Sequence, residues 1–276
     1  INILPLEEWN GEHRHHNLKK RSFNNEGEEV TSRNPYFLYT DVILSKAQVS
    51  QSMNSLYSKG HHDECLFVHR GKGILKSNFG SLTLTGGDYA IIPRGVIWQL
   101  DIDKPMELLV LETAGPIETP DRYRNRLGQL LEHSPYSERD IKTPQYENPV
   151  SGGSIEVVVR LGQGLQSYDY KHHPFDIIGW DGYYYPWSFN VNDFMPITGK
   201  VHQPPPVHQV FQAPGLVICN FVPRIFDYHP EAIPAPYAHS NVDSDEIHYY
   251  VSCLLYTSAA ADERSSVDLG GRRIIK

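Results

Sequence analysis

An imidazole and a carboxylate occur close together late in the chain, as His239 and Glu246. Both are ligand types that a divalent first-row metal accepts, and one His, a Glu and a later His would form the facial triad that suits non-haem Fe(II). A simpler interpretation is that His239 caps a turn and Glu246 is a solvated strand residue. These residues alone leave both interpretations open.

The segment around Glu246, DEIHYYVS at 245–252, repeats the earlier segment DECLFVHRG at 63–71. The earlier copy is followed by GDYAIIPRGVIW at 87–98. Together they resemble the cupin signature, in which a His-x-His and Glu strand precedes a Pro-x-Gly turn and a further His. Side chains alternate along a strand, so ligands on neighbouring strands of such a barrel can converge on one ion.

The two copies differ in their ligands. Counting back from Glu64 places Ser58 and Gly60 at the His positions, and Trp98 stands where the late His belongs. His61 and His62 are neighbours that would face opposite ways on a strand, which disfavours a shared metal site. We therefore expect a metal-free first copy.

In the second copy, the count from Glu246 places His239 and Asn241 at the two His positions. One imidazole and the carboxylate are kept there, so this copy is the candidate metal site.

Short strand-like segments recur between turn residues, and 20 Pro and 21 Gly are scattered along the chain. This pattern predicts an all-β fold. With the cupin resemblance it predicts a double jelly roll whose second barrel is truncated, and one short helix at about 121–132. The expected division is a metal-free jelly roll at 1–118, a connector at 119–165, a partial iron-binding jelly roll at 166–252 and a non-native tail at 253–276.

A formal net charge of −8 disfavours nonspecific binding to nucleic acid, which needs clustered cations. No apolar run approaches the roughly eighteen residues needed to cross a bilayer, so we expect a cytoplasmic protein without a membrane partner. The cysteines are Cys65, Cys219 and Cys253, without the spacing of a disulfide framework or a thiolate zinc site.

Several further motifs, in this order, resemble homogentisate 1,2-dioxygenases, most closely the bacterial branch. They are RYRN at 122–125, EHSP at 132–135, HHPFDIIGWDG at 172–182, FMPITG at 194–199 and PAPYAHSN at 234–241. The likeness covers most of the chain from about 36 to 252, and several motifs in register are more specific than any one of them.

The resemblance implies roles for individual residues. The first iron-binding His falls on His239 and the iron-binding Glu on Glu246. The acid/base His falls on His202, within HQPPP at 202–206, with His208 as a competing candidate. Tyr237 matches a substrate-binding tyrosine, whereas Ala238 departs from the usual second tyrosine, which puts local packing in doubt. His172 and His173 are interpreted as supporting the fold.

The implied reaction is Fe(II)-dependent opening of the homogentisate ring by dioxygen to give maleylacetoacetate, a step of tyrosine and phenylalanine breakdown. The partners would be the small aromatic substrate, dioxygen and further copies of the chain, as a trimer or hexamer. The alternatives are a gentisate-type or salicylate-type dioxygenase, in which both His of the first motif would be expected, and a non-catalytic bicupin that binds a small molecule.

The residues from Cys253 onward do not resemble the family. They resemble the translation of a transposase-type sequencing adapter. The spacing from Glu64 to Trp98 would place the third iron ligand beyond Lys276. We therefore expect this polypeptide to bind iron weakly, and its incomplete second barrel to leave strand edges that favour aggregation.

Overall fold

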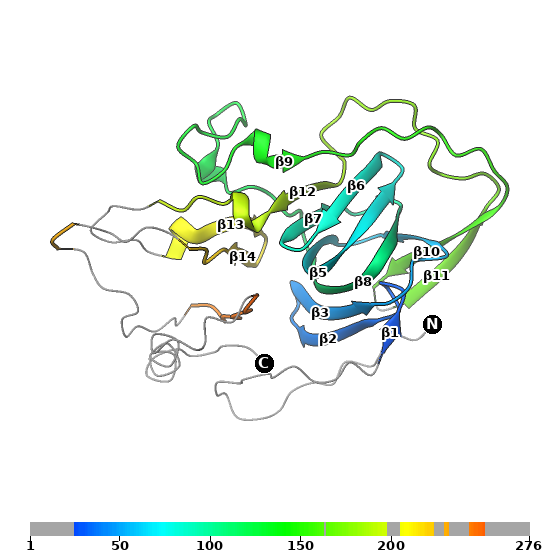
Figure 1. The fold of residues 1–276 in the computed structure, drawn as a ribbon, viewed down its shortest axis with the longest axis horizontal. Helices are drawn as coiled ribbons and strands as arrows, with labels where there is room; N and C mark the ends of the chain where they lie inside the picture. Colours follow the sequence, from blue (N-terminus) through cyan, green and yellow to red (C-terminus); the bar gives the residue numbers. More distant parts are fainter. Residues whose placement is uncertain (1–24, 163, 198–204, 224–228, 232–242, 252–276) are drawn as a thin grey trace. The chain divides into compact units, whose positions relative to one another are not determined.

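A computed structural model of the chain describes residues 25–162, 164–197, 205–223, 229–231 and 243–251 (Figure 1). The chain divides into two compact units. The described residues from 25 to 223 belong to the main unit, and those at 229–231 and 243–251 belong to the second.

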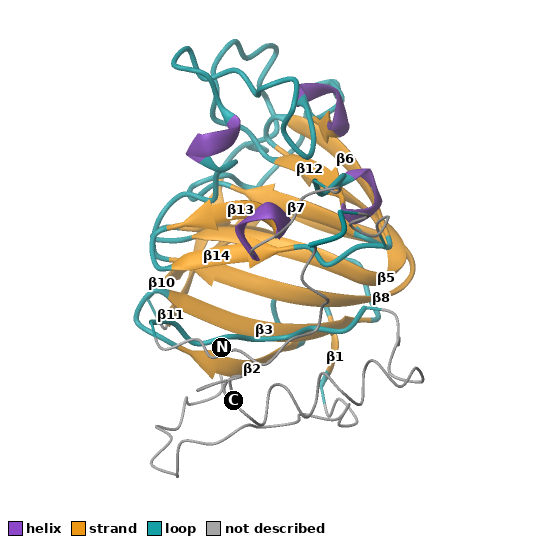
Figure 2. Cartoon of the chain, turned by 90° about the vertical axis from the view of Figure 1, so that its left-hand side faces the viewer, coloured by secondary structure: helices purple, strands orange, loops and turns teal. Residues whose placement is uncertain are grey.

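Strands are the main regular structure of the main unit, and loops and a few short helical turns connect them (Figure 2). Its large sheet has the order β11-β10-β4-β8-β5-β7-β12-β9, with β3 paired to β8, β1 and β2 paired to β3, and β6 paired to β5. A separate hairpin consists of β13 and β14. The strands are β1 Glu26–Gly27, β2 Arg33–Leu38, β3 Val42–Val49, β4 Leu56–Lys59, β5 Asp63–Ser77, β6 Gly80–Thr85, β7 Asp88–Ile92, β8 Trp98–Thr113, β9 Ile141–Lys142, β10 Ile155–Leu161, β11 Gly164–Tyr170, β12 Trp187–Asn190, β13 Gln209–Ala213 and β14 Leu216–Cys219.

The interior of this sheet follows from the alternation of side chains along its two longest strands. Leu66 and Val68 of β5 and Leu108 and Val110 of β8 belong to one buried apolar cluster. These two strands pair antiparallel along most of their length, and β3 lies on the other side of β8. We call the strands around this cluster the first barrel: β2–β8 and β10. The predicted all-β jelly-roll fold is confirmed.

Aromatic residues cover the opposite face of β5, β7 and β12. Phe211 of the β13–β14 hairpin packs edge-on against Tyr89 at 5.5 Å and Trp187 at 5.2 Å between ring centroids. Tyr136 lies 4.7 Å from Phe189 and donates a hydrogen bond to the Val210 carbonyl at 2.5 Å. Burial of large rings is a major source of packing energy, so this second core fixes the hairpin to the sheet.

The predicted helix at 121–132 is wrong. Only Asp121–Tyr123 forms a single 3-10 turn (η1), and Arg124 is already extended. The Asn125 side chain then accepts hydrogen bonds from the backbone N–H groups of Leu127 and Gln129, and Gly128 has a positive φ of 90°. Asn and Gly favour such a turn over a helix.

The large sheet continues past residue 118, because β10 pairs parallel with β4 and β12 pairs antiparallel with β7. The expected domain boundaries at 118, 165 and 252 stay predictions. Further 3-10 turns are η2 Glu138–Asp140, η3 Val191–Asp193 and η4 Pro205–His208. In the part of the chain that the structure describes, no helix is long and apolar enough to cross a membrane.

Candidate functional site

Three of the predicted site residues, His202, Tyr237 and His239, lie outside the described residues. Glu246 is described, in the second unit. Its side chain is partly exposed, at 38%, and its Oε2 atom lies 3.4 Å from Nε2 of His248. The predicted convergence of His239 and Glu246 therefore stays a prediction.

His248 is a residue that the sequence interpretation did not consider for the site. It follows Glu246 by two positions, so the alternation of side chains along an extended segment could have identified it as a neighbour of the carboxylate. A carboxylate and an imidazole are donor types that Fe(II) accepts, so this pair fits part of an iron site. Among the described residues, no group of three His, Cys, Asp or Glu side chains could hold a metal ion.

The other histidines named from the sequence lie in the main unit. His208 is only 7% exposed, its ring lies 4.7 Å from that of Phe221, and its carbonyl accepts a hydrogen bond from the Asn220 N–H at 2.7 Å. His173 Nδ1 accepts a hydrogen bond from the Phe175 N–H at 3.1 Å, and burial lowers the pKa of its ring. This contact gives His173 a structural role in its turn.

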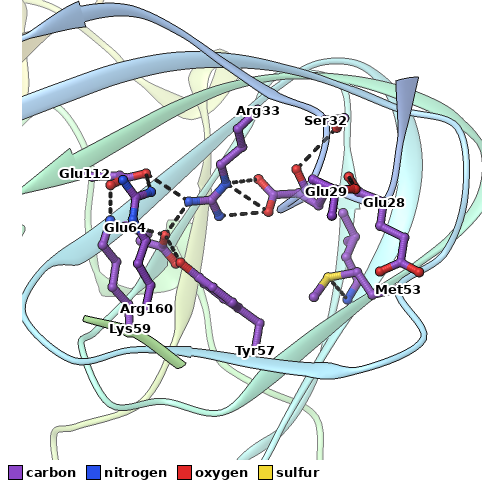
Figure 3. Close-up of polar contacts among 12 residues, drawn as sticks. Glu28, Glu29, Ser32, Arg33, Met53, Tyr57, Lys59, Glu64, Glu112 and Arg160 are labelled. Carbon is purple, nitrogen blue, oxygen red and sulfur yellow. Dashed lines mark hydrogen bonds and ion pairs between the residues drawn. The ribbon is translucent and has the colours of Figure 1, made fainter. Parts of the chain in front are cut away.

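Six buried charged side chains gather around Glu64, which the cupin count places at a ligand position (Figure 3). We call this set the ion cluster. It consists of Glu29, Arg33, Lys59, Glu64, Glu112 and Arg160. Glu64, Glu112 and Lys59 each lie two positions from a core residue of β5, β8 or β4, so they share the inward face of these strands.

Arg33 and Glu112 are the centres of the cluster. Arg33 contacts Glu29 at 2.8 Å, Glu64 at 2.6 Å and Glu112 at 3.0 Å. Glu112 also contacts Arg160 at 2.6 Å and forms an ion pair with Lys59. Three carboxylates thus face three cations, and this balance allows burial of charges that could not be buried singly.

The cluster shifts the pKa values of its members. Burial acts to raise the pKa of Glu112, but the nearby cations Lys59, Arg33 and Arg160 lower it to about 2. Burial raises the pKa of Glu29 against the opposing effect of Arg33. Burial also lowers the pKa of Lys59, and the carboxylates of Glu64 and Glu112 offset this only in part.

Trp98, at the position of the expected late His, is fully buried, and its ring packs edge-on against Tyr57 at 5.5 Å. Tyr57 also lies under Arg33, whose guanidinium carbon is 5.4 Å from the ring centre. The interior of the first barrel next to Glu64 is therefore occupied by the Trp98 indole, the Tyr57 phenol and the ion cluster.

Comparison with known proteins shows the family. The model for the homogentisate 1,2-dioxygenase N-terminal region matches residues 29–191. The chain belongs to the homogentisate 1,2-dioxygenase family. The matched region contains every residue of the ion cluster, and it ends before all the residues predicted to act in catalysis.

Individual relatives agree with this assignment. A putative dioxygenase of Saccharolobus solfataricus is 40% identical over 91% of this chain and 67% of its own length. Homogentisate 1,2-dioxygenases of Rhodopseudomonas palustris and Mus musculus are 27% and 26% identical, each over 71% of this chain and 45% of their own length. The chain therefore spans less than half the length of these two homogentisate dioxygenases.

Proposed function

We propose that this chain is part of an Fe(II)-dependent ring-cleaving dioxygenase that converts homogentisate and dioxygen into maleylacetoacetate. The observation that carries the proposal is the family match over residues 29–191, which agrees with the motifs that follow it in the sequence. The relatives at 26–27% identity are homogentisate 1,2-dioxygenases, and this supports the choice of substrate.

In this proposal His239 and Glu246 hold the iron, which when bound supplies a Lewis acid and a template that orients substrate and dioxygen. His202 takes the proton from the ring hydroxyl, a role that suits a neutral imidazole because its ordinary pKa lies near neutral pH. Tyr237 contacts the substrate. His248, at 3.4 Å from the Glu246 carboxylate, orients that carboxylate.

A second candidate is a dioxygenase that cleaves a different dihydroxy-aromatic acid, such as gentisate. It is favoured by one observation: the 40% identical relative has the name of a putative dioxygenase without a stated substrate. The relatives named for homogentisate are more distant.

The test is oxygen uptake by the protein that carries this chain, reconstituted with Fe(II) under anaerobic conditions and given homogentisate, gentisate or no substrate. Uptake with homogentisate alone supports the proposal, and uptake with gentisate alone supports the second candidate. Iron binding without uptake would favour a non-catalytic binding protein. Gel filtration of the same sample tests the proposed trimer or hexamer.

Two variants test the roles proposed for His202 and His239 separately. His202→Ala is expected to slow turnover by a factor of roughly 10² to 10⁴ while iron content stays unchanged, since it removes the general base alone. His239→Ala is expected to lose the iron itself. Equal iron loss in both variants would contradict the role assigned to His202.

A further inference from the structure

We propose that Glu29, Glu64 and Glu112 form a binding site for a guanidinium ion inside the first barrel, and that the chain's own Arg33 fills this site. The ligand class is a small alkylguanidinium cation. Figure 3 shows the guanidinium of Arg33 between the three carboxylates, which come from the turn before β2 and from strands β5 and β8.

The contacts use every nitrogen of the guanidinium. Nε and Nη2 donate to the two oxygens of Glu29 at distances from 2.8 to 3.1 Å, a bidentate arrangement. Nη1 donates to Oε1 of Glu64 at 2.6 Å and to Oε1 of Glu112 at 3.0 Å. A planar fork can make these bonds at once, whereas an ammonium group is a point charge without that geometry.

The sheet itself creates the need for a cation here. Glu64 of β5 and Glu112 of β8 are direct partners in the register of these strands, so two buried carboxylates face each other. Like charges opposite each other on neighbouring strands are destabilising. These carboxylates need neighbouring cations: Lys59 forms ion pairs with both, and Arg33 of β2 contacts both from another side.

A second observation points to a ligand site rather than to an ion pair alone. Oε2 of Glu64 has no hydrogen-bond partner although its side chain is only 1% exposed. The Tyr57 ring provides a flat wall at 5.4 Å from the guanidinium carbon of Arg33. Carboxylate oxygens at the edge and an aromatic face below are the features that recognise a guanidinium.

The charge balance favours a singly charged ligand over a metal ion. Lys59 and Arg160 already provide two positive charges to the three carboxylates of the site. One guanidinium completes neutrality, whereas a divalent metal would leave a net positive charge in a buried region. Such an uncompensated charge is strongly unfavourable.

The experiment is chemical rescue of Arg33→Ala in the full chain, followed by the melting temperature and far-UV circular dichroism. The variant is expected to melt roughly 10 °C lower than the unchanged protein, because three buried carboxylates lose a partner. Methylguanidinium at low millimolar concentration is expected to recover about half of this loss in a saturable manner. Methylammonium and Mn²⁺ at the same concentration are expected to recover little.

Three controls define the site. The exposed Arg139 provides a matched variant, Arg139→Ala, whose melting temperature is expected not to respond to methylguanidinium. Adding Glu64→Gln to Arg33→Ala is expected to weaken the rescue at least tenfold, since it removes one recognising carboxylate. The unchanged protein is expected to show no rise in melting temperature, because its site is already filled.

The proposal is overturned if methylguanidinium does not raise the melting temperature of Arg33→Ala, or if methylammonium or Mn²⁺ does so equally well. It is also overturned if Arg33→Ala stays unfolded when refolded with methylguanidinium. These readouts do not involve turnover, so they are independent of the proposed dioxygenase activity.

Discussion

Glu112 is the carboxylate on which most of the buried cations converge, with Arg33, Lys59 and Arg160 all in contact with it. The change Glu112→Gln keeps the shape of the side chain and removes its charge. We expect it to lower the free energy of unfolding by roughly 3–5 kcal/mol, because it leaves buried cations without compensation. Urea unfolding measures this loss.

The control for this change is Glu118→Gln, since Glu118 is also a glutamate of the main unit but is exposed. Its expected effect is within about 0.5 kcal/mol of zero. Equal effects of the two changes would show that the ion cluster contributes little to stability.

The low pKa of Glu112 also predicts how stability depends on pH. Its folded-state pKa of about 2 lies below the ordinary value of 4.5, so its stabilisation is present above pH 4.5 and is lost as pH falls toward 2. Glu29, whose pKa is raised, acts in the opposite direction. We expect Glu112→Gln to flatten the acid side of a plot of unfolding free energy against pH, measured between pH 5 and 2. An acid side as steep as that of the unchanged protein would contradict the shift.

At the residue scale, the sequence predicted part of the first-barrel site. The cupin count singled out Glu64 and Trp98 because the spacing within a strand and its following turn is local, and the structure shows both side chains buried. It could not predict that Arg33 and Arg160 reach the same place, because their contacts depend on long-range pairing of β2 and β10 with other strands. His202, Tyr237 and His239 stay predictions.

At the element scale, the turn between β5 and β6 depends on Gly80. Its φ is 117°, and a Cβ atom there would lie 2.1 Å from the Gln145 carbonyl oxygen. We expect Gly80→Ala to destabilise the protein by more than about 2 kcal/mol, because backbone strain and a clash with the backbone add together. Thermal or urea unfolding measures the effect.

Gly128 offers a matched comparison, with a φ of 90° and no atom within 4 Å of an added Cβ. Gly128→Ala therefore tests the strain of positive φ alone, and we expect a loss of about 1 kcal/mol. If Gly80→Ala cost no more than Gly128→Ala, the close approach of Gln145 would not constrain this turn.

The alternation and turn residues were enough to predict strands, yet they failed at 121–132. There we predicted a helix, whereas Asn125 and Gly128 form a local turn that uses backbone groups a helix would need. The second core was also not predicted. Phe211 and Tyr89 meet across more than a hundred residues, and no local pattern encodes that contact.

At the scale of the whole molecule, the main unit is held together by contacts that cross the expected boundary at 118. Arg160 of β10 pairs with Glu112 of β8, and the strand register places it beside Lys59 of β4. On the other face, Phe211 packs on Tyr89 of β7. The stability of strands β2 to β8 therefore depends on later residues, with Arg160 contacting them inside the barrel and Phe211 packing on the outer face.

This dependence predicts the behaviour of fragments. A fragment of residues 25–118 keeps β1 to β8 but loses the β10 partner of β4, the Arg160 contact and the aromatic cover. We expect it to bind a hydrophobic dye and to unfold without a sharp transition, because it exposes a strand edge and leaves Glu112 with one cation fewer. A fragment of residues 25–223 keeps all three features and is expected to unfold cooperatively. A cooperative transition at the same urea concentration in both fragments would show that residues 25–118 fold independently, as the sequence first suggested.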